Sequence, residues 1–229
     1  MKAWKFLCKF EDNLKQFMCQ PSKIVLDIGS NDCQNFPFLF HFHGFEKYVG
    51  IDKCSEFQIF QEGNADLSDI EEYYRDYQSK NVFDQQINSF FTLYENVCSG
   101  FYDLKFQLSK PIFNKHLSFI KKEINERTNF RKLIKDNIDL IILSDFLHLF
   151  NKSKALTIFR NSISILKDSG FAYLTIPNEE YTQERKRKGS INIKWGIKRS
   201  KVEEFISPLN ILIIDESENR INLLCGRNN

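Results

Sequence analysis

Short apolar runs alternate with amphipathic stretches along most of this chain. Apolar, β-branched runs between turn residues predict buried strands, and apolar positions three or four residues apart predict helices. The predicted strands are 23–28, 47–52, 57–61, 138–144, 171–176, 209–214 and 220–224. The predicted helices between them are 36–43, 153–167 and 200–207. This alternation predicts an α/β fold with a mostly parallel sheet, whose last two strands form an antiparallel hairpin at one edge.

Two stretches depart from this alternation within what we expect to be a single domain, 1–229. Residues 1–20 have the spacing of an amphipathic helix, which would pack on the domain or act as a lid over a pocket. Residues 69–136 are polar, rich in Phe and Tyr, and spaced like helices. They are too many for a simple crossover or a structureless loop. We therefore expect 69–136 to be a helical insertion that serves as a cap or substrate subdomain.

The turn after the first predicted strand is the first candidate for chemistry. The apolar run 23–28 is followed by Gly29 and a small polar loop, and then by the predicted helix. A strand, a glycine turn and a helix together place backbone N–H groups against a bound ligand. The second predicted strand ends on Asp52. A carboxylate at that end of a strand can accept hydrogen bonds from two neighbouring hydroxyl groups of a ligand.

Composition excludes several other classes of protein. A net charge of +2 over 229 residues does not indicate a general polyanion binder, and the 23 Phe fit a bias towards AT-rich codons. The six Cys show no C-x-x-C spacing, and with four scattered His they make no zinc pattern. No stretch approaches the roughly 20 apolar residues of a membrane span, and the N-terminus does not read as a signal peptide. We expect a cytoplasmic protein with reduced thiols and no metal.

With these elements in place, the chain resembles the class I S-adenosylmethionine-dependent methyltransferases, which have a Rossmann-like sheet. The segments that carry the resemblance are Val-Leu-Asp-Ile-Gly-Ser-Asn-Asp-Cys at 25–33, Tyr-Val-Gly-Ile-Asp at 48–52, Gly-Asn-Ala-Asp at 63–66, Ile-Asp-Leu-Ile-Ile-Leu-Ser-Asp-Phe-Leu-His-Leu at 138–149 and Ile-Leu-Lys-Asp-Ser-Gly-Phe-Ala-Tyr-Leu-Thr-Ile at 165–176. The closing strand pair also suits this family. The resemblance covers residues 22–68 and 137–227, but not 69–136. A dinucleotide-binding dehydrogenase fits less well, because its glycine fingerprint falls on Asn31 and Gln34.

The resemblance implies a set of residues that bind S-adenosyl-L-methionine. Asp52 would hold the ribose hydroxyls, and Asp66 would lie near the adenine amino group. The cofactor loop and the far side of the cofactor would be formed by Asp27, Gly29, Ser30, Asn31, Ser144 and Asp145. The family usually has further glycines where this chain has Asn31 and Cys33. Asn tolerates left-handed backbone angles better than most residues, whereas Cys33 adds a side chain where the backbone comes close to the ligand.

The implied activity is methyl transfer by direct displacement, in which the protein mainly supplies binding and alignment. The first interpretation is transfer to a small-molecule acceptor. The second is an RNA or protein methyltransferase, and the third is a methyltransferase-like binding module without catalysis. No catalytic residue is assigned. His148 is a weak candidate for a general base, with a structural role as the alternative.

The positive charge is concentrated in one segment, 184–201, which holds eight basic residues and one acidic residue. Arg185, Lys186, Arg187 and Lys188 are consecutive. This run is either a solvated surface or a contact for nucleic acid or another phosphate-bearing partner. Trp195, in the same segment, would stack on a base or close the core.

Overall fold

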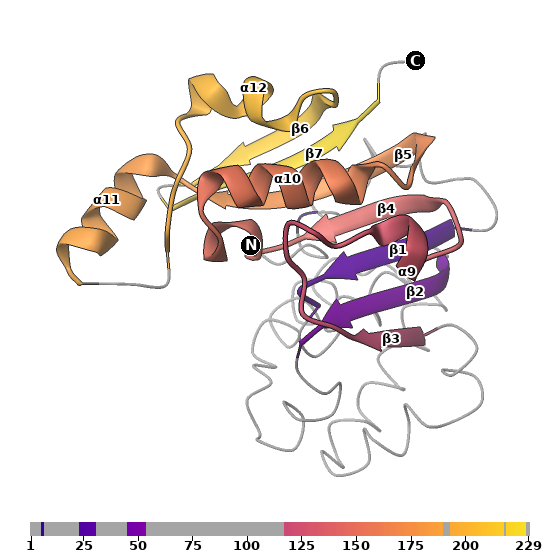
Figure 1. Cartoon of the computed structure of the whole chain (residues 1–229). Coiled ribbons are helices and arrows are strands. Elements are labelled where there is room, and N and C mark those ends of the chain that lie inside the picture. The colour runs from indigo at the N-terminus through magenta and orange to yellow at the C-terminus, as the bar shows by residue number, and fades with distance from the viewer. Residues whose placement is uncertain are drawn as a thin grey trace, which may run out of the picture.

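The computed structural model describes Phe6 and residues 23–30, 45–53, 117–189, 193–217 and 219–227. These residues form one seven-stranded sheet in the order β3-β2-β1-β4-β5-β7-β6 (Figure 1). The strands are β1 Lys23–Ile28, β2 Phe45–Asp52, β3 Leu117–Lys121, β4 Ile138–Leu143, β5 Leu166–Pro177, β6 Asn210–Glu216 and β7 Arg220–Gly226. The five strands β1 to β5 are mutually parallel, and β7 runs antiparallel to both β5 and β6. The mostly parallel sheet with a closing antiparallel hairpin is confirmed.

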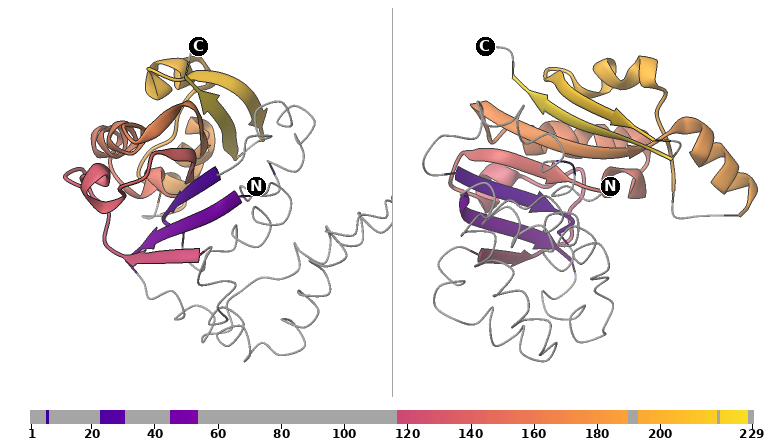
Figure 2. Two further views of the ribbon diagram at one scale, coloured as in Figure 1. Left: turned by 90° about the vertical axis from the view of Figure 1, so that its right-hand side faces the viewer. Right: turned by 180° about the vertical axis from the view of Figure 1, so that it is seen from behind.

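Short helices connect and cover these strands. They are α9 Phe130–Leu133, η2 Leu147–Leu149, α10 Lys152–Ile163, α11 Glu179–Arg187, η3 Arg199–Lys201 and α12 Val202–Ile206. Figures 1 and 2 show α10 and α12 lying on the same face of the sheet, whereas α11 projects beyond it. Among the described helices, none is long and apolar enough to cross a membrane.

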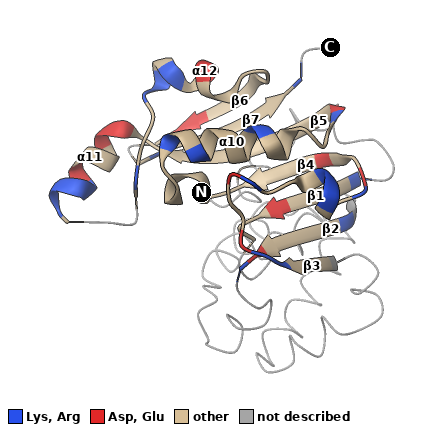
Figure 3. Cartoon of the chain, viewed as in Figure 1, with Lys and Arg blue, Asp and Glu red and all other residues tan. Residues whose placement is uncertain are grey.

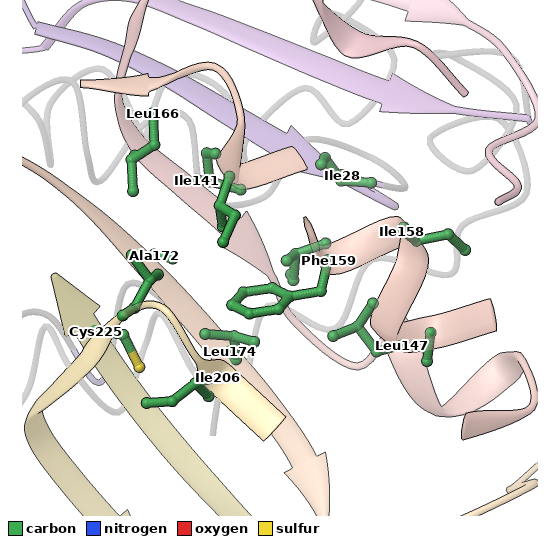
Figure 4. Close-up of a cluster of buried hydrophobic side chains, with 14 of the residues drawn as sticks. Ile28, Ile141, Leu147, Ile158, Phe159, Leu166, Ala172, Leu174, Ile206 and Cys225 are labelled. Atoms are coloured by element: carbon green, nitrogen blue, oxygen red, sulfur yellow. The ribbon is translucent and has the colours of Figure 1, made fainter. Parts of the chain in front are cut away.

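One face of the sheet forms the hydrophobic core. Successive side chains of a strand point to opposite faces, so every second residue reaches this side. Ile141 and Leu174 lie here against Phe159 of α10 and Ile206 of α12 (Figure 4), and all four are fully buried. Burial of such side chains stabilises the fold by about 1.5–3 kcal/mol each. This core fixes the strand ends from which the candidate site is built.

The opposite face carries buried polar side chains. The Tyr48 hydroxyl donates to the Asp27 carboxylate, which joins β1 to β2. The Thr175 hydroxyl donates to the Tyr173 oxygen at 3.0 Å, and the Tyr173 hydroxyl donates to the Asn222 side-chain oxygen at 3.1 Å. Phe6 is fully buried on this face, with its ring centroid 5.0 Å from that of Tyr173. Phe6 therefore packs on this face, and the other residues of the predicted helix 1–20 lie outside the described residues.

The helical insertion predicted for 69–136 is wrong over its last part. Leu117–Lys121 is a strand, paired in parallel with β2 from Tyr48–Leu117 to Asp52–Lys121. In the described part of the range after β3, only Phe130–Leu133 is α-helical. A five-residue segment with only three apolar residues is ambiguous between helix and strand, and pairing along the edge of β2 decides its structure. The predicted third strand, 57–61, and the predicted helix 36–43 lie outside the described residues.

Candidate functional site

The strand order contains one topological switch point, between β1 and β4. In sheets of this kind, ligands bind outside the carboxyl ends of the strands at such a point. The segments that follow β1, β2 and β4 are therefore the candidate site. They contain most of the described residues that the sequence predicts for cofactor binding.

The turn after β1 requires its glycine for two reasons. Gly29 has a φ of 73°, which side chains disfavour. A Cβ atom there would also lie 2.4 Å from Cδ2 of Phe146, in the segment after β4. The Gly29 and Ser30 N–H groups both donate to the Ile51 carbonyl, at 2.8 and 3.2 Å. The turn is thus tied to β2 and packed against the end of β4, so the segments that flank the switch point are held together.

Two acidic residues lie near this turn in different environments. Asp27 is 2% exposed and accepts its hydrogen bond from Tyr48, so it supports the turn from within the sheet. Asp52 is half-buried at the last position of β2, beside the residue that pairs with Ile28. Its backbone carbonyl accepts from the Lys122 N–H at 2.7 Å. Asp52 therefore lies at the carboxyl edge, where a carboxylate can hold the two hydroxyls of a ribose.

The segment beside Asp52 differs from the sequence prediction. Asp66 lies outside the described residues, as does Asn31. The strand next to β2 is β3, and it is followed at the same edge by Lys122, Glu123, Ile124 and Asn125. Sequence reasoning missed these residues because it placed the third strand at 57–61. The topology places 122–125 beside Asp52, at the carboxyl edge of the sheet.

Asp145, two residues beyond β4, has two unfavourable features. Its φ is 51°, in the left-handed region that few non-glycine residues adopt. Its Oδ2 pairs with Nη1 of Arg220 at 2.5 Å, while its Oδ1 is buried and has no hydrogen-bond partner among the described residues. Each of these features costs roughly 1–3 kcal/mol. Such residues concentrate at functional sites, so Asp145 is the strongest candidate on this side of the turn. Ser144 precedes it and is half-buried.

His148 lies in η2, and the segment 193–198 donates two hydrogen bonds to backbone carbonyls of η2. The Lys194 N–H donates to the His148 carbonyl at 3.1 Å, and Nε1 of Trp195 donates to the Leu147 carbonyl at 3.3 Å. Nδ1 of His148 is buried without a hydrogen-bond partner among the described residues. Burial lowers the pKa of His148 below its usual value; Arg220 lowers it further, and Asp145 opposes the shift. His148 is therefore uncharged at neutral pH.

The basic run lies on α11, which begins with Asn178 as N-cap and ends in Arg185, Lys186 and Arg187. All three side chains and Lys188 are exposed, and Figure 3 shows them gathered at the projecting end of the helix. Lys188 pairs with Glu184, and Nζ of Lys186 donates to the Lys194 carbonyl at 2.6 Å. The basic surface therefore connects through Lys194 to the segment that carries His148.

Trp195 does not belong to that exposed surface. It is 7% exposed, and its ring centroid lies 5.2 Å from that of Phe205 in the core. The alternative that it stacks on a base is wrong, because its faces are covered by the core.

The structure brings Gly29, Ser30, Asp52, Ser144 and Asp145 to one edge of the sheet. Sequence reasoning missed Arg220, the first residue of β7, because nothing in its local pattern indicates that it reaches Asp145. Among the described residues, no three His, Cys, Asp or Glu side chains gather as a metal site would require.

Comparisons with known proteins agree with this topology. No protein-family model matches the chain, and no curated protein sequence matches it. Its structure is similar to that of magnesium protoporphyrin IX methyltransferase from Synechocystis with bound SAH, with a TM-score of 0.57 and 10% identity over 98% of this chain and 83% of that one. It is also similar to the N-methyltransferase NodS from Bradyrhizobium japonicum in complex with S-adenosyl-L-homocysteine, with a TM-score of 0.54 and 11% identity over 100% and 89% of the two chains.

A third similar structure is an O-methyltransferase family protein from Burkholderia thailandensis, with a TM-score of 0.55 and 10% identity. The chain spans 57% of the length of that protein. At these identities the likeness concerns the fold. The chain therefore has the fold of the Rossmann-like, S-adenosylmethionine-dependent methyltransferases.

Proposed function

We propose that the chain is an S-adenosylmethionine-dependent methyltransferase with a small-molecule acceptor. The observation that carries this proposal is the meeting of the Gly29 turn, Asp52 and Asp145 at the switch point of a sheet with the methyltransferase strand order. The similar structures support it, since their names describe O- and N-methyltransferases, two of them with bound SAH.

The residues present fit this cofactor. Asp52 at the end of β2 would accept from the ribose hydroxyls, and the Gly29 turn lets the ligand approach the backbone closely. When bound, S-adenosylmethionine supplies an activated methyl group on a sulfonium. The protein then needs to bind the acceptor, align it and exclude water. His148, uncharged at neutral pH, would take the proton of an O–H or N–H acceptor as general base.

Calorimetry with S-adenosylmethionine tests the proposal. Asp52→Ala should weaken binding at least tenfold, which corresponds to about 1.4 kcal/mol, because the ribose hydroxyls lose their acceptor. Asp168→Ala is the matched control, since Asp168 is exposed and pairs with Arg227 beyond the other end of β7. Its affinity should equal that of the wild type. Failure of the wild type to bind would overturn the proposal. Binding without transfer to any acceptor would favour the non-catalytic module.

A second candidate function is methylation of a nucleic acid. It is favoured by the two hydrogen bonds that connect the basic end of α11, through Lys194, to the backbone of His148. A strand bound along this surface would present a base near the carboxyl edge of the sheet. Phosphate contacts by Lys and Arg also make binding strongly dependent on salt.

Fluorescence anisotropy with RNA and DNA oligonucleotides separates this candidate from the first. Changing Arg185, Lys186, Arg187 and Lys188 together to Gln should abolish binding and its salt slope. An equal change of charge at four exposed residues elsewhere is the control; these are Lys132, Lys135, Lys152 and Arg160. Equal losses in both variants would indicate a general charge effect, and no binding by the wild type at low salt would exclude the candidate.

A further inference from the structure

The helix α11 and the segment 193–198 form an arm that projects beyond the sheet (Figures 1 and 3). The helix follows β5 and is terminated by Gly189, which has a φ of 81°. Among the described residues, no atom lies within 4 Å of the position that a Cβ atom on Gly189 would take. The tip of the arm is therefore not covered by the described part of the chain.

The base of the arm is fixed to the sheet. The Ile197 N–H donates to the Pro177 carbonyl at 3.0 Å, and the Glu179 N–H donates to the Ile197 carbonyl at 3.2 Å. A Cβ atom on Gly196 would lie 2.4 Å from Oγ1 of Thr182, so the returning segment lies directly against the helix. These contacts hold the arm in one orientation, which reduces the conformational entropy that is lost when a partner binds.

Two arginines near the tip are available to a partner. Arg185 and Arg187 are exposed, and neither forms an ion pair or hydrogen bond with the described residues. The neighbouring cations are engaged: Lys188 pairs with Glu184, and Nζ of Lys186 donates to a backbone carbonyl of the returning segment at 2.6 Å. A guanidinium group donates two parallel hydrogen bonds to a phosphate, so both arginines suit a phosphate-bearing partner.

The two arginines lie on opposite sides of the helix. Successive residues of an α-helix are about 100° apart around its axis, so residues i and i+2 are about 200° apart. A flat surface, such as a membrane or the face of an acidic protein, can contact only one of the two at a time. A groove with phosphates along both walls can contact both.

Duplex DNA offers such a groove. A helix with its side chains is about 10–12 Å across, and the major groove of B-DNA is about 12 Å wide. The major groove of an RNA duplex is too narrow for a helix. Single strands are held by aromatic side chains on which bases stack, and membrane-surface helices insert apolar ones into the lipid. Residues 183–189 contain neither kind of side chain, and Trp195 is buried in the core.

We propose that the arm docks in the major groove of duplex DNA, with Arg185 and Arg187 on the phosphates of opposite walls. Phosphate contacts carry no sequence information, so this docking does not depend on the DNA sequence. The inference does not rest on the proposed cofactor, and it applies equally to a small-molecule and to a nucleic-acid methyl acceptor.

Fluorescence anisotropy with a labelled DNA duplex, in the absence of cofactor, tests the proposal. Each lost phosphate contact should reduce the slope of log K against log salt by about one, and the affinity at about 0.1 M salt about five- to tenfold. Arg185→Gln and Arg187→Gln should each show this loss, and the double variant should lose about two units of slope. Arg160→Gln is the matched control, because Arg160 is exposed in the last turn of another helix, α10. It should bind like the wild type.

Competition with single strands, an RNA duplex and phosphatidylserine vesicles separates the groove from other partners. The DNA duplex should bind most tightly. Equal affinity for single strands or the RNA duplex would overturn the proposal, as would vesicle binding that depends on the same arginines. A loss confined to one arginine, an equal loss in Arg160→Gln, or no binding of the DNA duplex at low salt would also overturn it. Calorimetry with S-adenosylmethionine does not involve the arm, so the proposed function is judged separately.

Discussion

At the scale of single residues, the candidate site contains residues whose backbone conformation or buried polar atoms cost free energy of folding. Gly29 and Asp145 adopt positive φ, and two buried polar atoms, Oδ1 of Asp145 and Nδ1 of His148, have no hydrogen-bond partner among the described residues. Gly29, Asp52 and Asp145 were predictable, because they directly follow apolar runs whose ends are visible in the sequence. The contact between Arg220 and Asp145 was not predictable, because it depends on the order of the strands in the sheet.

His148 gives a prediction about pH. Burial lowers its pKa in the folded protein, whereas the unfolded chain has the ordinary value of about 6.5. The unfolded state therefore binds a proton more readily, so stability is retained above pH 6.5 and falls as the pH drops towards the folded pKa. Asp145 opposes this shift, and Arg220 adds to it.

Urea unfolding at pH 8.0 and pH 5.5 measures this effect. The wild type should lose more free energy of unfolding between the two pH values than His148→Gln does. The difference belongs to His148, because both proteins share all other titrating groups. Identical losses would show that His148 titrates normally in the folded protein.

At the scale of elements, the elements missed by sequence reasoning lack a clear apolar period. α11 is polar on nearly all sides, and Thr182 is its buried residue. It is instead stabilised at its ends, by the Asn178 cap, two Glu in its first turn and three basic residues in its last turn. β3 is a five-residue edge strand, too short to show a period of its own. The apolar run of β4 was predictable to within a residue, whereas β5 begins at Leu166, five residues before its predicted start.

The N-cap of α10 offers a test of how much a helix end contributes. Oδ1 of Asn151 accepts from the Lys154 N–H at 2.9 Å, and Asn151 itself is exposed. Asn151→Ala removes this bond and should lower the free energy of unfolding by about 1 kcal/mol. Asn151→Asp keeps the acceptor and should be neutral or slightly stabilising, because it adds negative charge at the helix N-terminus. Equal unfolding curves for all three proteins would show that the cap is not needed.

At the scale of the whole molecule, the sequence predicts the kind of sheet but not the place of its long insertion. Alternation of strands and helices leads to the parallel sheet and its closing hairpin. The strand that pairs with β2 begins at Leu117, so the long segment enters between β2 and β3 rather than after the third strand. Local pattern cannot settle this, because neighbouring strands are chosen by pairing between residues far apart in the sequence. The residues after Lys121 therefore lie beside Asp52 at the carboxyl edge of the sheet, whereas Asp66 lies outside the described residues.

The two faces of the sheet are covered by different parts of the chain. This difference gives a test of whether the segment that contains Phe6 contributes to the stability of the fold. Phe159 of α10 is fully buried on the core face, and Phe6 is fully buried against Tyr173 on the polar face. If the segment that contains Phe6 is an integral layer of the fold, Phe6→Ala should lower the free energy of unfolding by about 3 kcal/mol, as Phe159→Ala should. For a protein of this size the melting temperature would fall by roughly 6–12 °C. Leu212→Ala is the control, since Leu212 is 42% exposed on β6 and should change stability little. A Phe6→Ala variant as stable as Leu212→Ala would mean that the sheet folds without this segment, and the second face would then be available for a ligand or partner.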